Sequence, residues 1–322
     1  MLNRFSVTNI GIIFGIVFCL ISAIFDVYVG NISQKLSPAI IILYCFVSST
    51  LLFLCVSVSK TGPRNYYHKV KSNFRLIIFI NTSVVCNWGG LIVSLKYLEP
   101  AVVGIATVAC GPAITIVCSR FFRASTRPTS MESMISWCIL ALVIIMLANS
   151  YMGNSGVTGT NTFDRIIGIV CVSISAFGTV AYTLLSKGLN NDDWKSYEIL
   201  GVRNIIIVIF SGLYCIYNNI GIFLGFSGSI IMTLLVIFGH IIPIFLIQKT
   251  ISKLTPIHTS MVLLFLPIFT LTLQYFDTRI ELSWYSIYTV IGIIVLLLIQ
   301  SLNKLIFFDS KELVKSEKNC NN

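Results

Sequence analysis

Apolar runs of about 20 residues, the length at which an α-helix crosses a bilayer, recur along the whole chain. No other feature limits the fold as strongly. Hydrophobic residues make up 56% of the 322 residues and charged residues only 11%. In a typical soluble domain, charged residues make up roughly a quarter of all residues. The sequence therefore predicts an all-α integral membrane protein with the lipid bilayer as its solvent.

Turn-forming residues divide the apolar runs into ten predicted transmembrane helices. Stretches such as "GNISQKLSP", "GNSGVTGTNTFD" and "KGLNNDDWKS" are rich in Gly, Pro, Asn and Ser, which interrupt helices. The predicted helices span 9–30, 38–58, 74–97, 100–121, 131–151, 164–186, 197–218, 229–249, 256–276 and 284–304. The tail 307–322 is polar, and we expect it to lie in the cytoplasm.

Lysine and arginine distribute unevenly between the two sides of this threading. Of the 22 basic residues, 17 fall on the side that holds both chain ends, and Arg203 falls within a helix. The opposite side holds only four: Lys35, Lys96, Arg165 and Arg279. By the positive-inside rule both termini are cytoplasmic. The net charge of +10 then follows from topology, and we expect no nucleic-acid partner.

Two prolines within predicted helices suggest an internal repeat. Pro112 and Pro267 lie 155 residues apart, and a shift of 155 carries the first, third and fifth predicted helices onto the sixth, eighth and tenth. A unit of five helices must re-enter the membrane from the opposite face. The sequence thus predicts two inverted five-helix repeats, 1–152 and 153–306, an architecture of many secondary transporters. A duplication that serves packing alone is the alternative.

Two tracts resemble a known family. "LKYLEPAVVGIATVACGPAITIVCSRFF" and "ISKLTPIHTSMVLLFLPIFTLTLQYFDTRIELSWYSIYTVIGIIVLLL" are similar to the fourth- and ninth-helix regions of the drug/metabolite transporter superfamily, EamA type. Gly292 matches the early glycine of that family's last helix, and Glu281 its hairpin glutamate, whereas "RASTRPTS" in the first half lacks that glutamate. The resemblance implies ten helices, a central cavity, and export or uptake of small metabolites such as amino acids.

Polar residues fall near the middle of two helices that the repeat makes equivalent. Asn87 and Trp88 lie midway along the third helix, and His240 midway along the eighth, three residues before Pro243. Polar groups at this depth need a partner or a wet cavity. We therefore expect Asn87, Trp88 and His240 to bind a solute, His240 also to exchange protons, and Pro243 to kink its helix. The alternative for His240 is a neutral imidazole bonded to a neighbouring helix.

Three further side chains are candidates for the same cavity or its gates. Asp26, toward the outer end of the first helix, is predicted either to gate or couple protons or to be solvated at the interface. Tyr182 could line the cavity, and Arg203 is expected to snorkel to the cytoplasmic interface, at a depth that separates it from Asp26. The expected hinges are Pro112, Pro243 and Pro267.

These observations favour a secondary transporter, which we expect to be an exporter that moves small organic metabolites by alternating access. The alternatives are a membrane scaffold or sensor without transport and, with less support, an intramembrane enzyme, for which neither HExxH nor GxSxG occurs. Because the ten cysteines form no CxxC pair, no metal site is indicated and no cofactor is expected. Ile- and Asn-rich usage suggests an AT-rich genome and a bacterial inner membrane. We expect a monomer or a homodimer.

Overall fold

The computed structural model describes residues 2–117, 130–154, 156–254, 259, 262–263, 265–281 and 284–299. The tail 307–322, His258 and the ends of three predicted helices lie outside these residues. The α-helices are α1 (Leu2–Ile32), α2 (Pro38–Thr61), α3 (Pro63–Ser72), α4 (Phe74–Val84), α5 (Gly90–Tyr97), α6 (Pro100–Val117), α7 (Ser130–Met152), α8 (Thr162–Asn191), α9 (Ser196–Val202), α10 (Ile205–Tyr217), α11 (Gly225–Leu234), α12 (Ile242–Lys253) and α14 (Phe265–Gln274). A further helix covers Trp284–Ile299.

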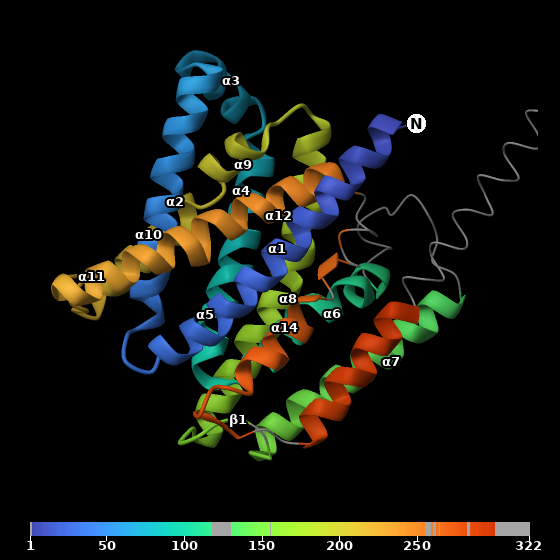
Figure 1. Ribbon diagram of the computed structural model, residues 1–322. Helices are drawn as coiled ribbons and strands as arrows, with labels where there is room; N and C mark the ends of the chain where they lie inside the picture. Colours follow the sequence, from blue (N-terminus) through green and yellow to red (C-terminus); the bar gives the residue numbers. More distant parts are fainter. Residues whose placement is uncertain are drawn as a thin grey trace, which may run out of the picture.

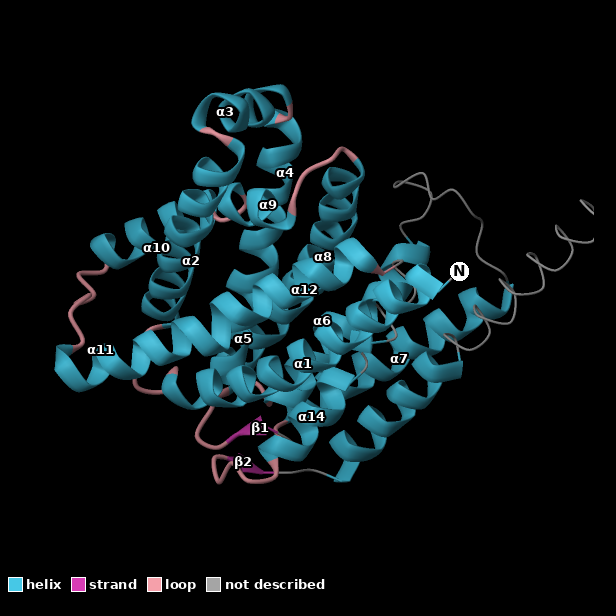
Figure 2. Cartoon of the chain, turned by 45° about the horizontal axis from the view of Figure 1, so that its top comes forward, coloured by secondary structure: helices cyan, strands magenta, loops and turns pink. Residues whose placement is uncertain are grey.

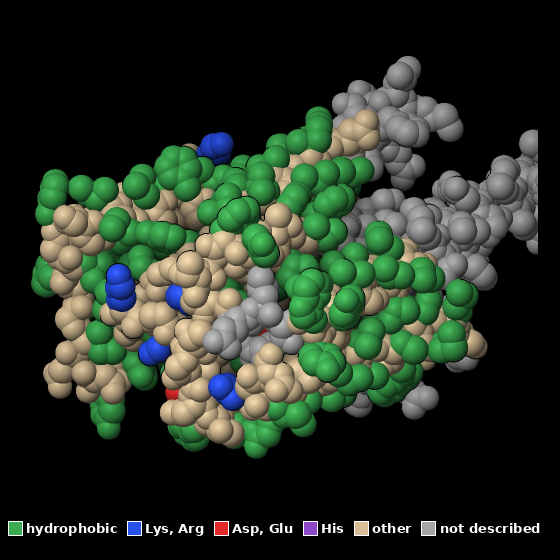
Figure 3. All heavy atoms as spheres, turned by 60° about the horizontal axis from the view of Figure 1, so that its bottom comes forward, with side chains coloured by type: hydrophobic (Ala, Val, Ile, Leu, Met, Phe, Trp, Pro, Cys, Tyr) green, Lys and Arg blue, Asp and Glu red, His purple; other side chains and the backbone are tan. Residues whose placement is uncertain are grey.

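The prediction of a helical membrane protein is confirmed. Each of the ten predicted ranges overlaps a helix, and seven helices of the described chain are long and apolar enough to cross a membrane. Large apolar side chains point outward, such as Phe79, Ile144 and Ile216, which are 63%, 66% and 70% exposed. Hydrophobic side chains also cover much of the face in Figure 3. Such a surface requires lipid rather than water, so the protein is a multi-pass membrane protein.

Three of the membrane-crossing segments are interrupted. The third contains the π-helical turn η1 (Val85–Gly89), and the eighth contains η3 (Leu235–Ile241) between α11 and α12. In the seventh, a turn at Arg203 and Asn204 separates α9 from α10. The apolar pattern predicted continuous helices here. The pattern reports burial, but not how the backbone hydrogen bonds are arranged.

Helix α8 lies at the centre of the fold (Figure 1), and it contacts α4, η1, α5, α6, α7 and α12. Two glycines allow its backbone to approach its neighbours. A Cβ atom at Gly178 would lie 2.4 Å from the backbone nitrogen of Asn87, and one at Gly90 would lie 2.4 Å from the carbonyl oxygen of Cys171. In the small-residue stretch of α6, by contrast, a Cβ at Gly104 would make an ordinary contact at 3.9 Å. The closest backbone packing is therefore between α8 and the third segment.

Around this centre, α1 contacts α12 and α14, and α2 contacts α9 and α10. Helix α7 and the helix Trp284–Ile299 lie side by side (Figure 1), where a Cβ at Gly292 would lie 3.6 Å from Leu142. Strands β1 (Gly156–Val157) and β2 (Ile280–Glu281) form a two-residue antiparallel pair, visible in Figure 2. This pair was not predicted, because two residues are too few to show a strand pattern.

The short helix α3 is held against α9 by one buried carboxylate. Glu198, whose side chain is 1% exposed, forms a salt bridge of 3.0 Å with Lys69 and accepts a hydrogen bond of 2.6 Å from the Thr61 hydroxyl. Tyr66 donates to the Glu198 carbonyl oxygen at 3.0 Å. Burial raises the pKa of Tyr66 to about 12, so its phenol remains a donor at physiological pH. Helix α3 lies in the gap between the predicted helices 38–58 and 74–97.

Candidate functional site

One cavity of about 80 Å³ lies among residues from both halves of the chain. Its volume equals two to three water molecules at about 30 Å³ each, far below the ~300–1,000 Å³ of pockets for drug-sized ligands. Its polar lining comes from α1, η1, α6, α8 and the turn between α9 and α10, and consists of Ser22, Asp26, Asn87, Thr107, Thr179, Tyr182, Thr183 and Arg203. Its apolar walls include Phe18, Phe25, Trp88, Leu91, Val108, Ile247, Ile251, Leu263 and Leu266.

The π-helical turn η1 places the predicted pair Asn87 and Trp88 in this lining. The Ser175 hydroxyl donates to the Asn87 carbonyl oxygen at 2.7 Å, and the Thr179 hydroxyl donates to Asn87 Oδ1 at 2.9 Å. A π-turn disturbs the normal i to i−4 ladder, and Ser175 from α8 bonds a carbonyl within it. Asn87 is thereby fixed by α8, while Trp88 presents an apolar wall.

His240 lies outside the residues that line the cavity. It is fully buried in η3, with its ring centroid 4.4 Å from that of Phe46 and 5.2 Å from that of Trp88. Its Nε2 lies 3.5 Å from the Ser49 hydroxyl, and its Nδ1 has no hydrogen-bond partner among the described residues. The imidazole therefore packs against the ring of Trp88, and Trp88 in turn borders the cavity. This arrangement is close to the alternative of a neutral ring that bonds a neighbouring helix.

Tyr182 and Arg203 lie against each other in the cavity wall. The guanidinium carbon of Arg203 lies 4.6 Å from the centroid of the Tyr182 ring, a cation–π distance. The Tyr182 hydroxyl in turn bonds Gln248 Oε1. Tyr182 was predicted as a lining residue, and the structure places it there.

The expectation that Arg203 snorkels to the interface was wrong. Its side chain is fully buried, and its three guanidinium nitrogens form no hydrogen bond with any residue that the structure describes. The turn that ends α9 at Arg203 places this side chain in the cavity rather than at the interface. The only signal in the sequence was a charge within a predicted helix, which commonly marks a functional position.

Asp26 also lines the cavity and is 3% exposed, so the alternative of plain interfacial solvation does not describe it. Sequence depth was expected to separate Asp26 from Arg203, but both border the same cavity. The described residues nevertheless include no ion pair between them. The cavity thus presents an acid and a base that do not neutralise one another by direct contact.

The three predicted hinge prolines lie within helices. Pro243 stands in the first turn of α12, directly after η3. Pro267 is buried in α14 next to Leu266, which lines the cavity. Pro112 lies within α6. Proline removes a backbone donor, and the π-turn before Pro243 is where the helix accommodates that loss.

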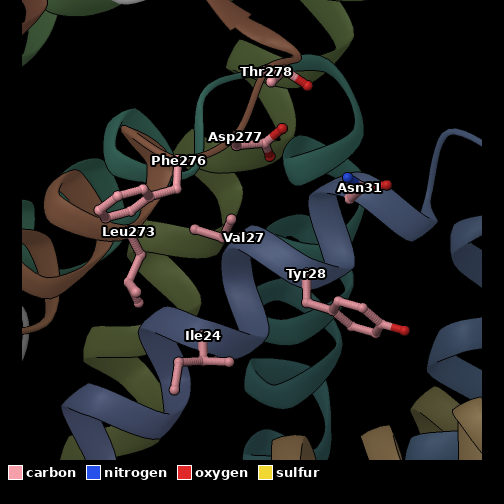
Figure 4. Close-up of a pocket in the computed structure, with 8 residues that line it drawn as sticks. All are labelled: Ile24, Val27, Tyr28, Asn31, Leu273, Phe276, Asp277 and Thr278. Atoms are coloured by element: carbon pink, nitrogen blue, oxygen red, sulfur yellow. The ribbon is translucent and has the colours of Figure 1, made fainter.

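A second, larger pocket of about 340 Å³ lies between the end of α1 and the segment after α14. Figure 4 shows its lining, with Val27 pointing toward the segment after α14 and Tyr28 pointing away from it; the lining residues are Ile24, Val27, Tyr28, Asn31, Leu273, Phe276, Asp277 and Thr278. Asp277 forms a salt bridge of 2.7 Å with Arg279, and Arg279 Nη1 donates to the Gly30 carbonyl oxygen at 2.6 Å. Asp277 and Arg279 therefore hold the segment after α14 to α1. Asp26 and Arg203 in the central cavity, by contrast, form no ion pair with each other.

No cluster of three or more His, Cys, Asp or Glu side chains suited to a metal occurs among the described residues. Glu281, the expected hairpin glutamate, lies in β2, and its backbone pairs with Gly156. Two buried side chains without a hydrogen-bond partner among the described residues, Ser22 and Arg203, border the central cavity.

Comparison with known proteins supports the fold alone. No family model matches the chain, and no curated protein matches it. Nine solved chains are similar in structure. One of them, described only as "Crystal structure of protein", has a TM-score of 0.60 at 12% sequence identity and covers 92% of this chain and 98% of its own. The architecture thus occurs in at least one other protein over nearly its whole length.

Proposed function

We propose that the chain is a secondary transporter, an exporter that moves small organic metabolites such as amino acids by alternating access. One observation carries this proposal: a small, partly open cavity between helices from both halves is lined by Asp26 and Arg203 without an ion pair between them. Burying ionisable side chains away from water is costly. A chain that keeps an acidic and a basic side chain beside a cavity has a use for them there.

The proposal includes two inverted five-helix repeats, 1–152 and 153–306, and membership of the drug/metabolite transporter superfamily, EamA type. Its support is the match between predicted and observed helix ranges and the position of the two π-turns. Val85–Gly89 and Leu235–Ile241 interrupt the third and eighth segments, which the repeat makes equivalent. Interrupted helices beside a central site are typical of inverted-repeat transporters.

Alternating access then follows from how the helices are built. The cavity of about 80 Å³ represents a closed state, and opening it requires segments to tilt about their weak points. We assign these hinges to Pro112, Pro243 and Pro267, with the π-turn before Pro243 as the most flexible joint. Trp88, supported by His240, forms a wall that such a tilt would move.

Protons are the proposed coupling ion, and Asp26 is the proposed proton carrier, because it borders the cavity and His240 does not. We place the protein in a bacterial inner membrane with both termini in the cytoplasm, as the lysine and arginine distribution indicates. We expect no cofactor. Its partners are the solute, the bilayer and protons, and it acts as a monomer or a homodimer.

A scaffold or sensor is the second candidate. It would need the same helices but no unpaired charges at a central cavity, so the pair Asp26 and Arg203 favours transport. An intramembrane enzyme would need a reactive constellation, and His240, enclosed by aromatic rings, is poorly placed to supply one.

An untargeted comparison of metabolites tests the proposal. Cells that express the protein and cells that express the Arg203→Met and Asp26→Asn double variant are compared for metabolites inside and outside. We expect at least one solute to accumulate outside only with the wild-type protein. Two results together would exclude a transporter: identical metabolite profiles of the two kinds of cell, and no movement of small organic metabolites such as amino acids in proteoliposomes.

A further inference from the structure

Arg203 carries a buried charge that the fold leaves unpaired. Its side chain is fully buried and borders the central cavity, yet Nε, Nη1 and Nη2 donate no hydrogen bond to any described residue. Buried charges in proteins are normally paired and hydrogen-bonded. A molecule that enters the cavity can supply the missing partner.

The neighbours of Arg203 fix its orientation without occupying its donors. The face of the Tyr182 ring lies 4.6 Å from the guanidinium carbon, and Gln248 holds the Tyr182 hydroxyl. Stacking uses the face of a guanidinium and leaves its edge of N–H groups available. That edge matches two oxygens in one plane, the arrangement of a carboxylate.

Other groups in the lining suit the same ligand. The Ser22 hydroxyl borders the cavity and has no hydrogen-bond partner among the described residues, so it can donate to an oxygen. Asp26 is the one acidic side chain in the described lining, and it forms no salt bridge with Arg203. The small volume, about 80 Å³, restricts the bound part of the solute to a few heavy atoms.

We propose that Arg203 binds the carboxylate of the transported solute and thereby determines the substrate class. This assignment rests on the proposed transport function and adds to it the chemical group that the cavity selects. The guanidinium N–H groups donate hydrogen bonds to the carboxylate oxygens, the Tyr182 ring packs against the guanidinium, and Ser22 supplies a further donor.

Two pairs of small probes test the assignment on the purified full-length protein. Propionate and propionamide differ in the carboxylate alone, and alanine and alaninamide repeat that difference in the presence of an amine. By calorimetric titration we expect each acid to bind at least 10-fold more tightly than its amide. In Arg203→Met we expect the ratio within both pairs to fall to about one. Arg64→Met, which changes an exposed arginine, is expected to keep the wild-type ratio.

A second measurement separates binding from folding. Because Arg203→Met removes an unpaired buried charge, we expect its melting temperature to be equal to or above that of the wild type. Arg203→Lys, which keeps the charge but loses the planar fork, is expected to retain a reduced preference for the acids. Equal affinity within both pairs, no detectable binding of either acid, or a preference that survives in Arg203→Met would overturn the assignment.

Failure of this inference is distinguishable from failure of the proposed function. Transport of solutes into proteoliposomes without preference for acids over amides would overturn the carboxylate assignment and leave the transport function standing. A preference for acids in binding, with no solute transported by the reconstituted protein, would overturn the proposed transport function.

Discussion

At the scale of single residues, the buried polar groups fall into two sets. Asn87 is fixed by Ser175 and Thr179, so the fold satisfies its amide oxygen. Arg203 and Asp26 border a cavity and form no ion pair with each other. The first set stabilises helix packing. The second destabilises the closed state and is therefore where we locate solute and proton binding.

Asp26 and His240 differ in their relation to the cavity, and this difference predicts distinct variants. In Asp26→Asn we expect uptake into proteoliposomes to lose its response to an imposed pH gradient, because the group that would carry the proton is gone. In His240→Phe we expect slower uptake with the response retained, because phenylalanine keeps most of the ring contacts with Phe46 and Trp88. The reverse result would move proton coupling to His240.

At the scale of helices, the fold depends on how closely α8 approaches η1. A Cβ at Gly178 would lie 2.4 Å from the Asn87 nitrogen and 2.9 Å from its Cα, whereas one at Gly188 on the same helix would meet nothing within 4 Å. Added volume in a tight contact costs about 1–3 kcal/mol, while alanine in an open helical position favours the helix by up to about 1 kcal/mol.

We therefore expect Gly178→Ala to lower the free energy of unfolding by about 1–3 kcal/mol and to reduce uptake, because the added methyl group would displace Asn87. Gly188→Ala is the matched control and should be neutral or slightly stabilising. Thermal unfolding in detergent measures both. Equal melting temperatures for the two variants would show that α8 and η1 separate more easily than this packing allows.

Helix α3 offers a prediction of its own. Glu198 accepts hydrogen bonds from Lys69, Thr61 and the Lys195 backbone, and a hydrogen bond to a charged group contributes about 1.5–3 kcal/mol. In Glu198→Gln we expect α3 to detach more often, so trypsin should cleave at Arg64, Lys69 or Lys71 faster than in the wild type. Asp192→Asn, at an exposed position, should leave the cleavage rate unchanged. An unchanged rate in Glu198→Gln would mean that Tyr66 alone holds the helix.

At the scale of the whole molecule, long apolar runs were sufficient to predict where the membrane-crossing segments lie, because a bilayer imposes one length and one polarity on each of them. It could not predict the π-turns η1 and η3, which depend on contacts between distant helices. Nor could it predict the position of Arg203. A depth counted along the sequence assumes a continuous helix, and α9 ends at that residue.

The candidate site was predicted in part for a similar reason. Four of the predicted side chains border the cavity: Asn87, Trp88, Tyr182 and Asp26. A polar group deep in an apolar helix needs a partner or a cavity, because lipid cannot bond it. The threonines of α8, Thr179 and Thr183, were missed, since threonine is common in membrane helices and there bonds its own backbone, as Thr183 does. His240 lies outside the cavity lining, because sequence position does not show which side chains separate a residue from a cavity.

The central claim is that the cavity is the path of a solute, and filling it tests this most directly. Thr183 borders the cavity, and its hydroxyl bonds the backbone four residues earlier at 2.8 Å. Thr272 makes the same bond at 2.8 Å from an exposed position. We expect Thr183→Trp to abolish uptake into proteoliposomes while Thr272→Trp transports like the wild type, with both variants eluting as folded protein. Wild-type transport by folded Thr183→Trp would contradict the claim.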